Sequence, residues 1–405
     1  MTGNTLLTLG GITREAVRLW KNSNAFLMSI DRQYDDQYAR TGAKIGDQLR
    51  IRLPNDFVPR TGPNLSLNTV NELQTTITMG TQKGVDVPFT SVDRTLSLDD
   101  YSERILAPMI NVLAGSVAAD IMSGANPSMI TSNTTTPTAT DFLKAGAQLD
   151  QMSAPRGNRK AILDPLTQAR TVGSLTGLFN PTGRISKQFD SGEMMGPALG
   201  IQDWMSDQTV LTTTPGTAGT LTVSGANQTG TSLTINAGVA GTLNEGDIIT
   251  IAGVHRVNRI TKVAGADLMQ FVVTATTNLA LNTPTAVPIY PAITPSNAGV
   301  AVQYQTVDSS PANAAAITLV QQANFGAGYR RNLVLRPEAV TMVTADLYMP
   351  TKGVVDAARE TFDNISLRMI ETYDVNTDQT ITRLDVLYGY LWVRPEWAVV
   401  VPDVV

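Results

Sequence analysis

The sequence predicts a mixed α+β protein that carries an all-β insertion, and three observations support this. Residues 44–54 and a second run from Glu72 to residue 90 alternate apolar with polar side chains, as strands do, and residues 97–123 place apolar side chains at helical spacing. Residues 216–325 hold only seven charged side chains, although 16% of the whole chain is charged. This stretch is rich in Thr, Ala, Gly and Val, and its short alternating runs between turns are typical of a small sandwich or barrel.

The composition excludes several classes of protein. The chain has 405 residues, 42% of them apolar, and a net charge of −5, so it can form more than one core and lacks the basic balance common in nucleic-acid-binding proteins. It contains no cysteine, which removes disulfides and thiolate metal sites. The apolar stretch 106–122 includes Asn111 and Asp120 and is too short to cross a membrane. Because MTGNTLLTLGG lacks the features of a signal peptide, we expect a soluble intracellular product.

A projecting β-hairpin is predicted near the N-terminus. KIGDQLRIRLP, residues 44–54, alternates apolar side chains with Arg50 and Arg52, which gives one apolar face and one basic face. A second alternating run begins at Glu72, after a stretch rich in Pro and Gly. Together the two runs predict a long hairpin whose tip extends away from the body.

Helical spacing predicts three helices, each with a capping residue. They cover 13–22 with Thr13 as N-cap, 97–123 with Ser97 as N-cap and a kink at Pro108, and 141–152 with Thr140 as N-cap. RKAILDP, at 159–165, predicts a short buried strand. After residue 332 we expect a strand, a helix near Pro337–Leu347, and several strands that complete the chain.

Motifs for catalysis are weak. His255 is the only histidine, and it lies in an alternating run beside a Gly-Asp turn, so a surface histidine on a β module is favoured over a Ser–His–carboxylate arrangement. GAGYRR, at 326–331, supplies only part of a phosphate loop and is interpreted as a hinge that leaves the insertion. No catalytic or cofactor-binding residue is assigned.

One segment has the spacing of a calcium loop. In DVNTDQTITRLD, Asp374, Asn376 and Asp378 occupy the first, third and fifth positions, and Asp385 the twelfth. Gln379 stands where the sharp turn of such a loop needs Gly, and the flanking runs resemble strands. A β-turn is therefore the favoured interpretation, and cation binding by the first three residues stays open.

Several stretches, in order along the chain, resemble the phage P-22 coat-protein family of major capsid proteins. The stretches are KIGDQLRIRLPNDF, ERILAPMINVLAGSVAADIM, APRGNRKAILDP, FNPTGRISKQFDSGEMMGPALG, GDIITIAGVHRVNRITKVAGADLMQFVVTA and RETFDNISLRMIETYDVNTDQTITRLDVLYGYLWVRPEWAVVV. The resemblance covers nearly the whole chain. It implies a Hong Kong-97-like capsid fold with an N-terminal arm, an extended β-hairpin loop, a spine-helix peripheral domain, an axial domain and an inserted β domain.

The resemblance and the composition together predict six segments. These are an N-terminal arm at 1–40, the extended loop and peripheral strands at 41–90, the peripheral domain with its spine helix at 91–160, the first axial part at 161–215, the inserted barrel-like domain at 216–325, and the second axial part with the C-terminal strands at 326–405.

The implied function is self-assembly into an icosahedral shell that encloses double-stranded DNA. The expected partners are further copies of the chain in pentamers and hexamers, a portal protein, and packaged DNA bound without sequence specificity; no membrane and no cofactor are expected. Because the chain begins almost directly with the arm helix, we also expect a separate scaffolding protein. The expected location is the virion, after assembly in the host cytoplasm.

Arg50, Arg52 and Arg60 are the candidate contacts between subunits. A projecting strand with a basic face suits an acidic partner surface, and one ion pair repeated at every interface can set register. The alternative is that the three side chains are solvated. Two other function classes compete with the capsid interpretation: a β-rich adhesion or glycan-binding protein, which the Thr/Gly-rich insertion would suit, and a hydrolase without a known motif.

Overall fold

Two units make up the fold, and each combines segments that are far apart in the sequence. Unit 1 comprises Met1–Ile51, Gln74–Ser123 and Val340–Val393, and unit 2 comprises Arg52–Leu73, Gly124–Ala339 and Arg394–Val405. The structure, a computed structural model, describes residues 9–32, 48–53, 56–59, 62–65, 67, 74–90, 105–124, 127–131, 136–175, 191–194, 196–296, 302–321, 328–350, 352–362 and 364–404.

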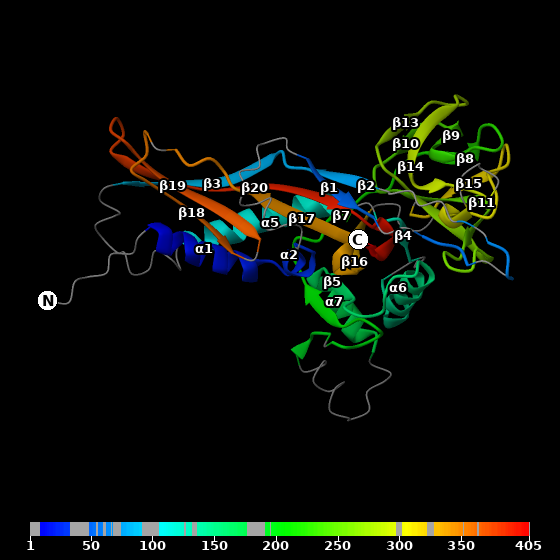
Figure 1. Cartoon of the computed structure of the whole chain (residues 1–405), viewed down its shortest axis with the longest axis horizontal. Helices are drawn as coiled ribbons and strands as arrows, with labels where there is room; N and C mark the ends of the chain where they lie inside the picture. Colours follow the sequence, from blue (N-terminus) through cyan, green and yellow to red (C-terminus); the bar gives the residue numbers. More distant parts are fainter. Residues whose placement is uncertain are drawn as a thin grey trace. The chain divides into compact units, whose positions relative to one another are not determined.

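The described residues of unit 1 form an antiparallel sheet and three helices. The strands follow the order β17 (Val340–Ala345), β20 (Gln379–Trp392), β19 (Ile365–Asp374) and β18 (Asp356–Phe362), and β3 (Thr81–Thr90) also pairs with β20. The helices are α1 (Leu9–Ser23), α2 (Ala25–Ser29) and α5 (Ala107–Ser123). The 14 residues of β20 pair with three strands in turn, and Figure 1 shows this long strand beside β3 and β19. Helix α1 packs against β18, β19 and α5.

Helix α5 confirms part of the predicted apolar stripe. Met109, Leu113 and Val117, which follow the helical spacing, are buried, whereas the neighbouring Val112 is 65% exposed. Residues 105 and 106 are π-helical and the α-helix begins at Ala107, so Pro108 lies next to the point where the helix type changes. The predicted N-cap, Ser97, lies outside the described residues.

The two predicted strands of the hairpin pair with each other, but the second is shorter than its alternating run. Strand β1 (Gln48–Arg52) pairs with β2 (Gln74–Thr78) in a two-stranded sheet. The alternating run from Glu72 does not continue as one strand, because it is interrupted at Met79 and Gly80 and then joins β20 as β3. The prediction for α1 also needs correction: this helix starts before Thr13, which is buried inside it rather than capping it.

In unit 2 the described residues form a second sheet and two helices. The strand order is β4 (Met129–Ile130), β21 (Ala398–Val404), β16 (Tyr329–Leu335), β5 (Lys160–Leu163) and β6 (Asp203–Ser206), with β7 (Thr212–Thr213) also on β16. The helices are α6 (Ala139–Gln151) and α7 (Pro165–Gly173). The short buried strand predicted from RKAILDP is β5. Its neighbour β16 is almost wholly buried, as a central strand with apolar faces should be.

The start of α6 differs from the prediction by two residues. The N-cap is Thr138 rather than Thr140. The Asp141 carboxylate reaches back to accept the Thr138 N–H at 2.9 Å and the Thr138 hydroxyl at 2.9 Å. Asp141 therefore identifies Thr138 as the N-cap, because in a capping box the side chain that accepts the N-cap N–H belongs to the residue three positions later.

The prediction of a helix near Pro337–Leu347 is wrong. A single 3₁₀ turn, η4 (Pro337–Ala339), is followed by strand β17, all six residues of which are buried. Its sequence, VTMVTA, is dominated by β-branched side chains, and these favour a strand that is covered on both faces. Pairing of β17 with β20 then satisfies its backbone.

A closed barrel of six strands lies within unit 2. The order around the barrel is β11 (Ile248–Val257), β12 (Ala264–Val273), β14 (Thr285–Ile293), β9 (Gly230–Val239), β8 (Gly219–Val223) and β15 (Ala316–Leu319), and β10 (Gly241–Leu243) pairs separately with β13 (Thr277–Leu279). Five of the six barrel strands contain or overlap the alternating runs identified in the sequence. The described part of unit 2 also includes the 3₁₀ turns η3 (Val302–Tyr304) and η5 (Pro395–Trp397), in addition to η4.

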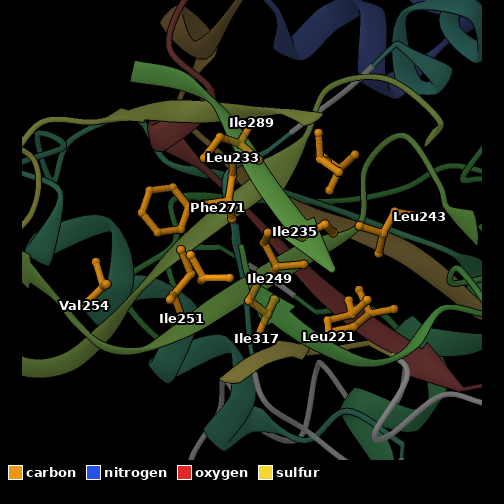
Figure 2. Packing of buried hydrophobic residues seen from close by; sticks show 14 of the residues in the cluster. Leu221, Leu233, Ile235, Leu243, Ile249, Ile251, Val254, Phe271, Ile289 and Ile317 are labelled. Carbon is orange, nitrogen blue, oxygen red and sulfur yellow. The ribbon is translucent and has the colours of Figure 1, made fainter. Parts of the chain in front are cut away.

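The barrel interior explains why this part of the sequence is poor in charge. Alternate residues point inward and are buried on several of the strands, as Leu233 and Ile235 are on β9. Figure 2 shows Leu221, Leu233, Ile249, Phe271, Ile289 and Ile317, from the six barrel strands, among the side chains of one cluster. Every member of this cluster is less than 10% exposed. The packed interior leaves only the outward positions for polar side chains, and threonine fills many of them.

Candidate subunit contacts and the barrel junction

Strand β1 presents the basic face that the sequence predicts. Ile51 is fully buried and packs with Ile77, Met79 and Leu347, while Arg50 and Arg52 on either side of it are exposed. The alternation follows from the two-residue period of a strand, which sends successive side chains to opposite faces. Arg60, the third predicted contact, lies outside the described residues.

Apolar side chains on the segment after β1 are exposed, and the sequence analysis did not single them out. Phe57 is 58% exposed, Leu65 79% and Leu67 83%. Large apolar side chains that gather on one exposed segment mark a surface for protein contacts. In the sequence, these residues are interrupted by Pro, Gly and Asn, so no period distinguishes them from ordinary loop residues.

An ion-pair network joins the barrel to the rest of unit 2. Arg259, in the turn between β11 and β12, donates from Nε to Asp56 Oδ2 at 2.8 Å and from Nη1 to Glu396 Oε1 at 3.4 Å. The Tyr290 hydroxyl of β14 donates to Glu396 Oε2 at 2.8 Å. Burial acts to lower the pKa of Arg259, but its bonds to the two carboxylates outweigh this and raise it. Burial first, and then Glu396, raises the pKa of Tyr290.

We expect Glu396→Ala to lower the free energy of unfolding by about 2–3 kcal/mol, because it leaves the buried Tyr290 hydroxyl without its acceptor and removes one partner of Arg259. Glu396→Gln keeps an acceptor for Tyr290 and serves as the matched control, with a loss of about 1 kcal/mol. Equilibrium urea unfolding of the unassembled subunit measures both. Equal losses for the two variants would mean that the hydroxyl bond contributes nothing.

A second connection uses side-chain amides. The side-chain amide of Gln270, on β12, accepts the Ile130 N–H at 2.9 Å and donates to the Ile130 carbonyl at 3.2 Å. It thus bonds to β4 as the backbone of a neighbouring strand would. Gln148 of α6 donates to the same carbonyl at 3.1 Å. Beside them Arg256 of β11 donates to Gln151 of α6. The barrel is therefore fixed to α6 and β4 by bonds that its own sequence pattern does not reveal.

His255 takes part in a local hydrogen-bond pair. Its backbone N–H donates to Asp308 Oδ1 at 2.7 Å, and its Nδ1 lies 2.9 Å from Asp308 Oδ2. Burial raises the pKa of Asp308, but the bonds from His255 and Ser309 outweigh it and lower the pKa. The Ser309 hydroxyl donates to Gly253 and Asp308. The serine and the histidine thus both contact the carboxylate, whereas a triad needs the serine on the imidazole.

The segment with calcium-loop spacing forms a hairpin turn between β19 and β20. Asp374 accepts the Asn376 N–H at 2.9 Å and the Thr377 hydroxyl at 3.0 Å, and Asp378 accepts the Tyr373 hydroxyl at 2.8 Å. Asp385 is committed elsewhere, to Arg368 and Arg383. Within the described part of the chain, no group of three or more carboxylates or histidines is placed to hold a metal ion.

The glycine of GAGYRR that the structure describes, Gly328, precedes β16 and has φ +143°, a backbone angle that side chains rarely adopt. Strand β16 begins at the next residue, so the second half of this motif lies in a sheet rather than in a phosphate-binding turn. Among the described residues, no helix is long and apolar enough to span a membrane.

Comparison with known proteins decides the family. A family model described as "P22 coat protein - gene protein 5" matches residues 30–401. The chain belongs to the P-22 coat-protein family. It is a major capsid protein of a bacteriophage, and it forms an icosahedral shell from copies of itself. Its location is the capsid of the virion, and the structural role of the family implies that this coat protein is not an enzyme.

Solved structures of other phages are similar to this coat protein. The structure from Mycobacterium phage Che8 shares 12% identity over 93% of this chain and 90% of that chain, with a TM-score of 0.47. The capsid of cyanophage P-SCSP1u shares 13% identity over 89% and 84%, with a TM-score of 0.41. The CUS-3 coat protein I-domain shares 34% identity over 24% of this chain and 93% of that chain, with a TM-score of 0.20. No curated protein matches the chain.

Proposed function

We propose that the chain is a Hong Kong-97-like capsid subunit in which α5 of unit 1 is the spine helix. The β1–β2 ribbon and the segment that follows β1, which belongs to unit 2, form the extended loop that meets neighbouring subunits. The sheet of unit 2 corresponds to the axial domain and the barrel to an inserted domain. The six segments expected from the sequence, 1–40, 41–90, 91–160, 161–215, 216–325 and 326–405, stay a proposal, and they do not coincide with the two units: residues 124–160 belong to unit 2 and residues 340–393 to unit 1.

The observation that carries the proposal is the surface of the ribbon and of the segment that follows it. Arg50 and Arg52 are exposed on one face of β1, and Phe57, Leu65 and Leu67 are exposed on the segment beyond it. A surface with a basic part and an apolar part suits a neighbouring subunit that offers carboxylates and an apolar patch. The apolar part would supply most of the binding energy and the arginines the register.

Assembly proceeds through pentamers and hexamers in the host cytoplasm, with a separate scaffolding protein and a portal protein. The shell encloses double-stranded DNA without sequence-specific contacts. A net charge of −5 supports this role, since a wall that bound phosphate tightly would hinder packaging and release. An adhesion module or a hydrolase has no comparable support from family membership.

Charge reversal at β1 tests the proposed contact. We expect the double variant Arg50→Glu/Arg52→Glu to raise the subunit concentration needed for shell assembly by at least about fivefold, because two weak ion pairs at each interface sum to about 1 kcal/mol. Light scattering of assembling subunits measures this concentration.

The matched control is Arg50→Lys/Arg52→Lys, which keeps both charges and should assemble close to the wild-type concentration. Circular dichroism of the unassembled subunits checks that both variants are folded. Unchanged assembly of the glutamate variant would remove these two arginines from the subunit contact.

A further inference from the structure

A buried carboxylate sits where the chain enters the barrel. Asp247 lies in the turn between β10 and β11 and is 1% exposed. Its Oδ2 accepts the Asn244 N–H at 2.8 Å and the Gly216 N–H at 3.0 Å. Its Oδ1 is buried and has no hydrogen-bond partner. One half of the carboxylate is thus satisfied and the other half is desolvated without compensation, which is an unfavourable state for a charge.

The same turn contacts both points at which the chain passes between the barrel and the sheet of unit 2. Gly216 lies between β7, on the sheet, and β8, the first barrel strand. A Cβ at Gly216 would stand 2.6 Å from Asp247 Oδ2 and 2.3 Å from the Thr242 carbonyl, so only glycine allows this approach.

The exit from the barrel is held in a similar way. Gln321, which follows the last barrel strand, accepts the Ile248 N–H at 2.8 Å and donates to the Gly246 carbonyl at 3.4 Å. Arg331, on the strand that receives the chain, acts on Asp247 electrostatically and is 7% exposed. We call Gly216, Asn244, Asp247, Gln321 and Arg331 the crossing cluster.

The electrostatics of the cluster favour a proton on Asp247. Burial raises the pKa of Asp247 to about 6, and the two backbone N–H groups and Arg331 only partly oppose this. Among the described residues, the ionisable groups that interact with Asp247 are Arg331 and Tyr329, both on β16. Burial raises the pKa of Tyr329, so this group stays neutral between pH 5 and pH 8.

We propose that the crossing cluster is a pH-sensitive hinge, in which ionisation of Asp247 favours local opening at the two chain crossings and protonation holds them closed. The direction follows from linkage. The closed state binds the proton more tightly than an open state in which water reaches the carboxylate, so raising the pH shifts the equilibrium toward the open state. Such a hinge would loosen the two crossings near neutral pH, while the barrel core stays folded and the contacts of Arg259 and Gln270 stay in place. The proposal depends on the barrel and its crossings and does not require the proposed subunit contacts.

Amide hydrogen exchange on the full-length unassembled subunit tests the hinge. The informative amides are those of Gly216, Asn244 and Ile248, and amides within the β9–β14 pairing serve as an internal reference. After correction for intrinsic exchange rates, the population of the open state should rise about tenfold between pH 5 and pH 8. This is the change expected if the pKa of Asp247 is about 6 in the closed state and has its ordinary carboxylate value in the open state. The reference amides should not show this rise.

Two variants separate the hinge from a general effect of pH. Asp247→Asn removes the titration and should abolish the tenfold rise; if it does not fold, Asp247→Ser replaces it. Asp308→Asn changes another barrel carboxylate, one whose pKa is lowered, and should leave the rise intact. No rise in the wild type, or the same rise in the Asp247 variant, would overturn the proposal. Either result would leave the capsid function unaffected.

Discussion

Asp385→Ala lowers the free energy of unfolding by about 3–5 kcal/mol, the largest loss that we expect from a single charged side chain in unit 1. Asp385 lies in the middle of β20 and is fully buried. It bonds to Arg368 of β19 and accepts from Arg383 Nε at 2.9 Å. The alanine variant leaves Arg368, whose side chain is 12% exposed, as a buried cation without its carboxylate.

Gly84 makes this arrangement possible. It pairs with Asp385 across β3 and β20, and a Cβ at Gly84 would stand 2.3 Å from the Asp385 Oδ1 atom. The carboxylate thus lies over a position that has no side chain. Gly84 has no side chain that could fill the space left by the carboxylate in the alanine variant. A cavity would therefore remain beside Arg368.

The control for Asp385→Ala is Asp86→Ala. The Asp86 carboxylate is 3.7 Å from the same Arg383, but its side chain is 59% exposed, so we expect a loss below about 1 kcal/mol. Urea unfolding of the unassembled subunit, followed by amide exchange of β19 and β20, measures both variants. If the two losses are equal, burial of Asp385 does not determine the stability of this sheet.

Phe271→Ala should destabilise the barrel by about 3–5 kcal/mol. Phe271 is fully buried and belongs to the apolar cluster at the barrel centre (Figure 2), so its removal leaves a cavity lined by side chains from neighbouring strands. A closed barrel has no free edge through which the strands can move inward. Amide protection in the barrel should therefore fall by about two to three orders of magnitude.

Leu268→Ala is the matched control on the same strand, because Leu268 faces outward and is 39% exposed. We expect it to change barrel protection by less than about tenfold. Amides of β19 and β20, in unit 1, should keep their protection in both variants. A Phe271 variant with wild-type protection in the barrel would contradict the packing described for its interior.

The sequence predicts an element well where its residues follow a regular pattern that burial enforces. Strand β1 follows the alternation around Ile51, and the strands of the barrel follow the low-charge runs between turns. The helix wrongly predicted near Pro337–Leu347 shows the limit. The apolar residues of this segment fit both the helical period of 3.6 and the strand period of 2. The segment forms strand β17 because it pairs with β20, which lies 40 or more residues later in the sequence.

The candidate contacts were predicted only in part, for a similar reason. Arg50 and Arg52 could be found because charge on one face of a strand is a local pattern. The network of Arg259 with Asp56 and Glu396 joins residues separated by 203 and 137 positions, and Asp247 meets Gly216 across 31. No local period connects such residues, since the topology of the chain brings them together.

The most direct test of the central claim is electron microscopy of the purified full-length chain, alone and mixed with a candidate scaffolding protein. The account predicts closed icosahedral shells, or rings of five and six subunits, in at least one of the two preparations. Folded subunits that stay monomeric in both preparations, at concentrations where coat proteins assemble, would contradict it.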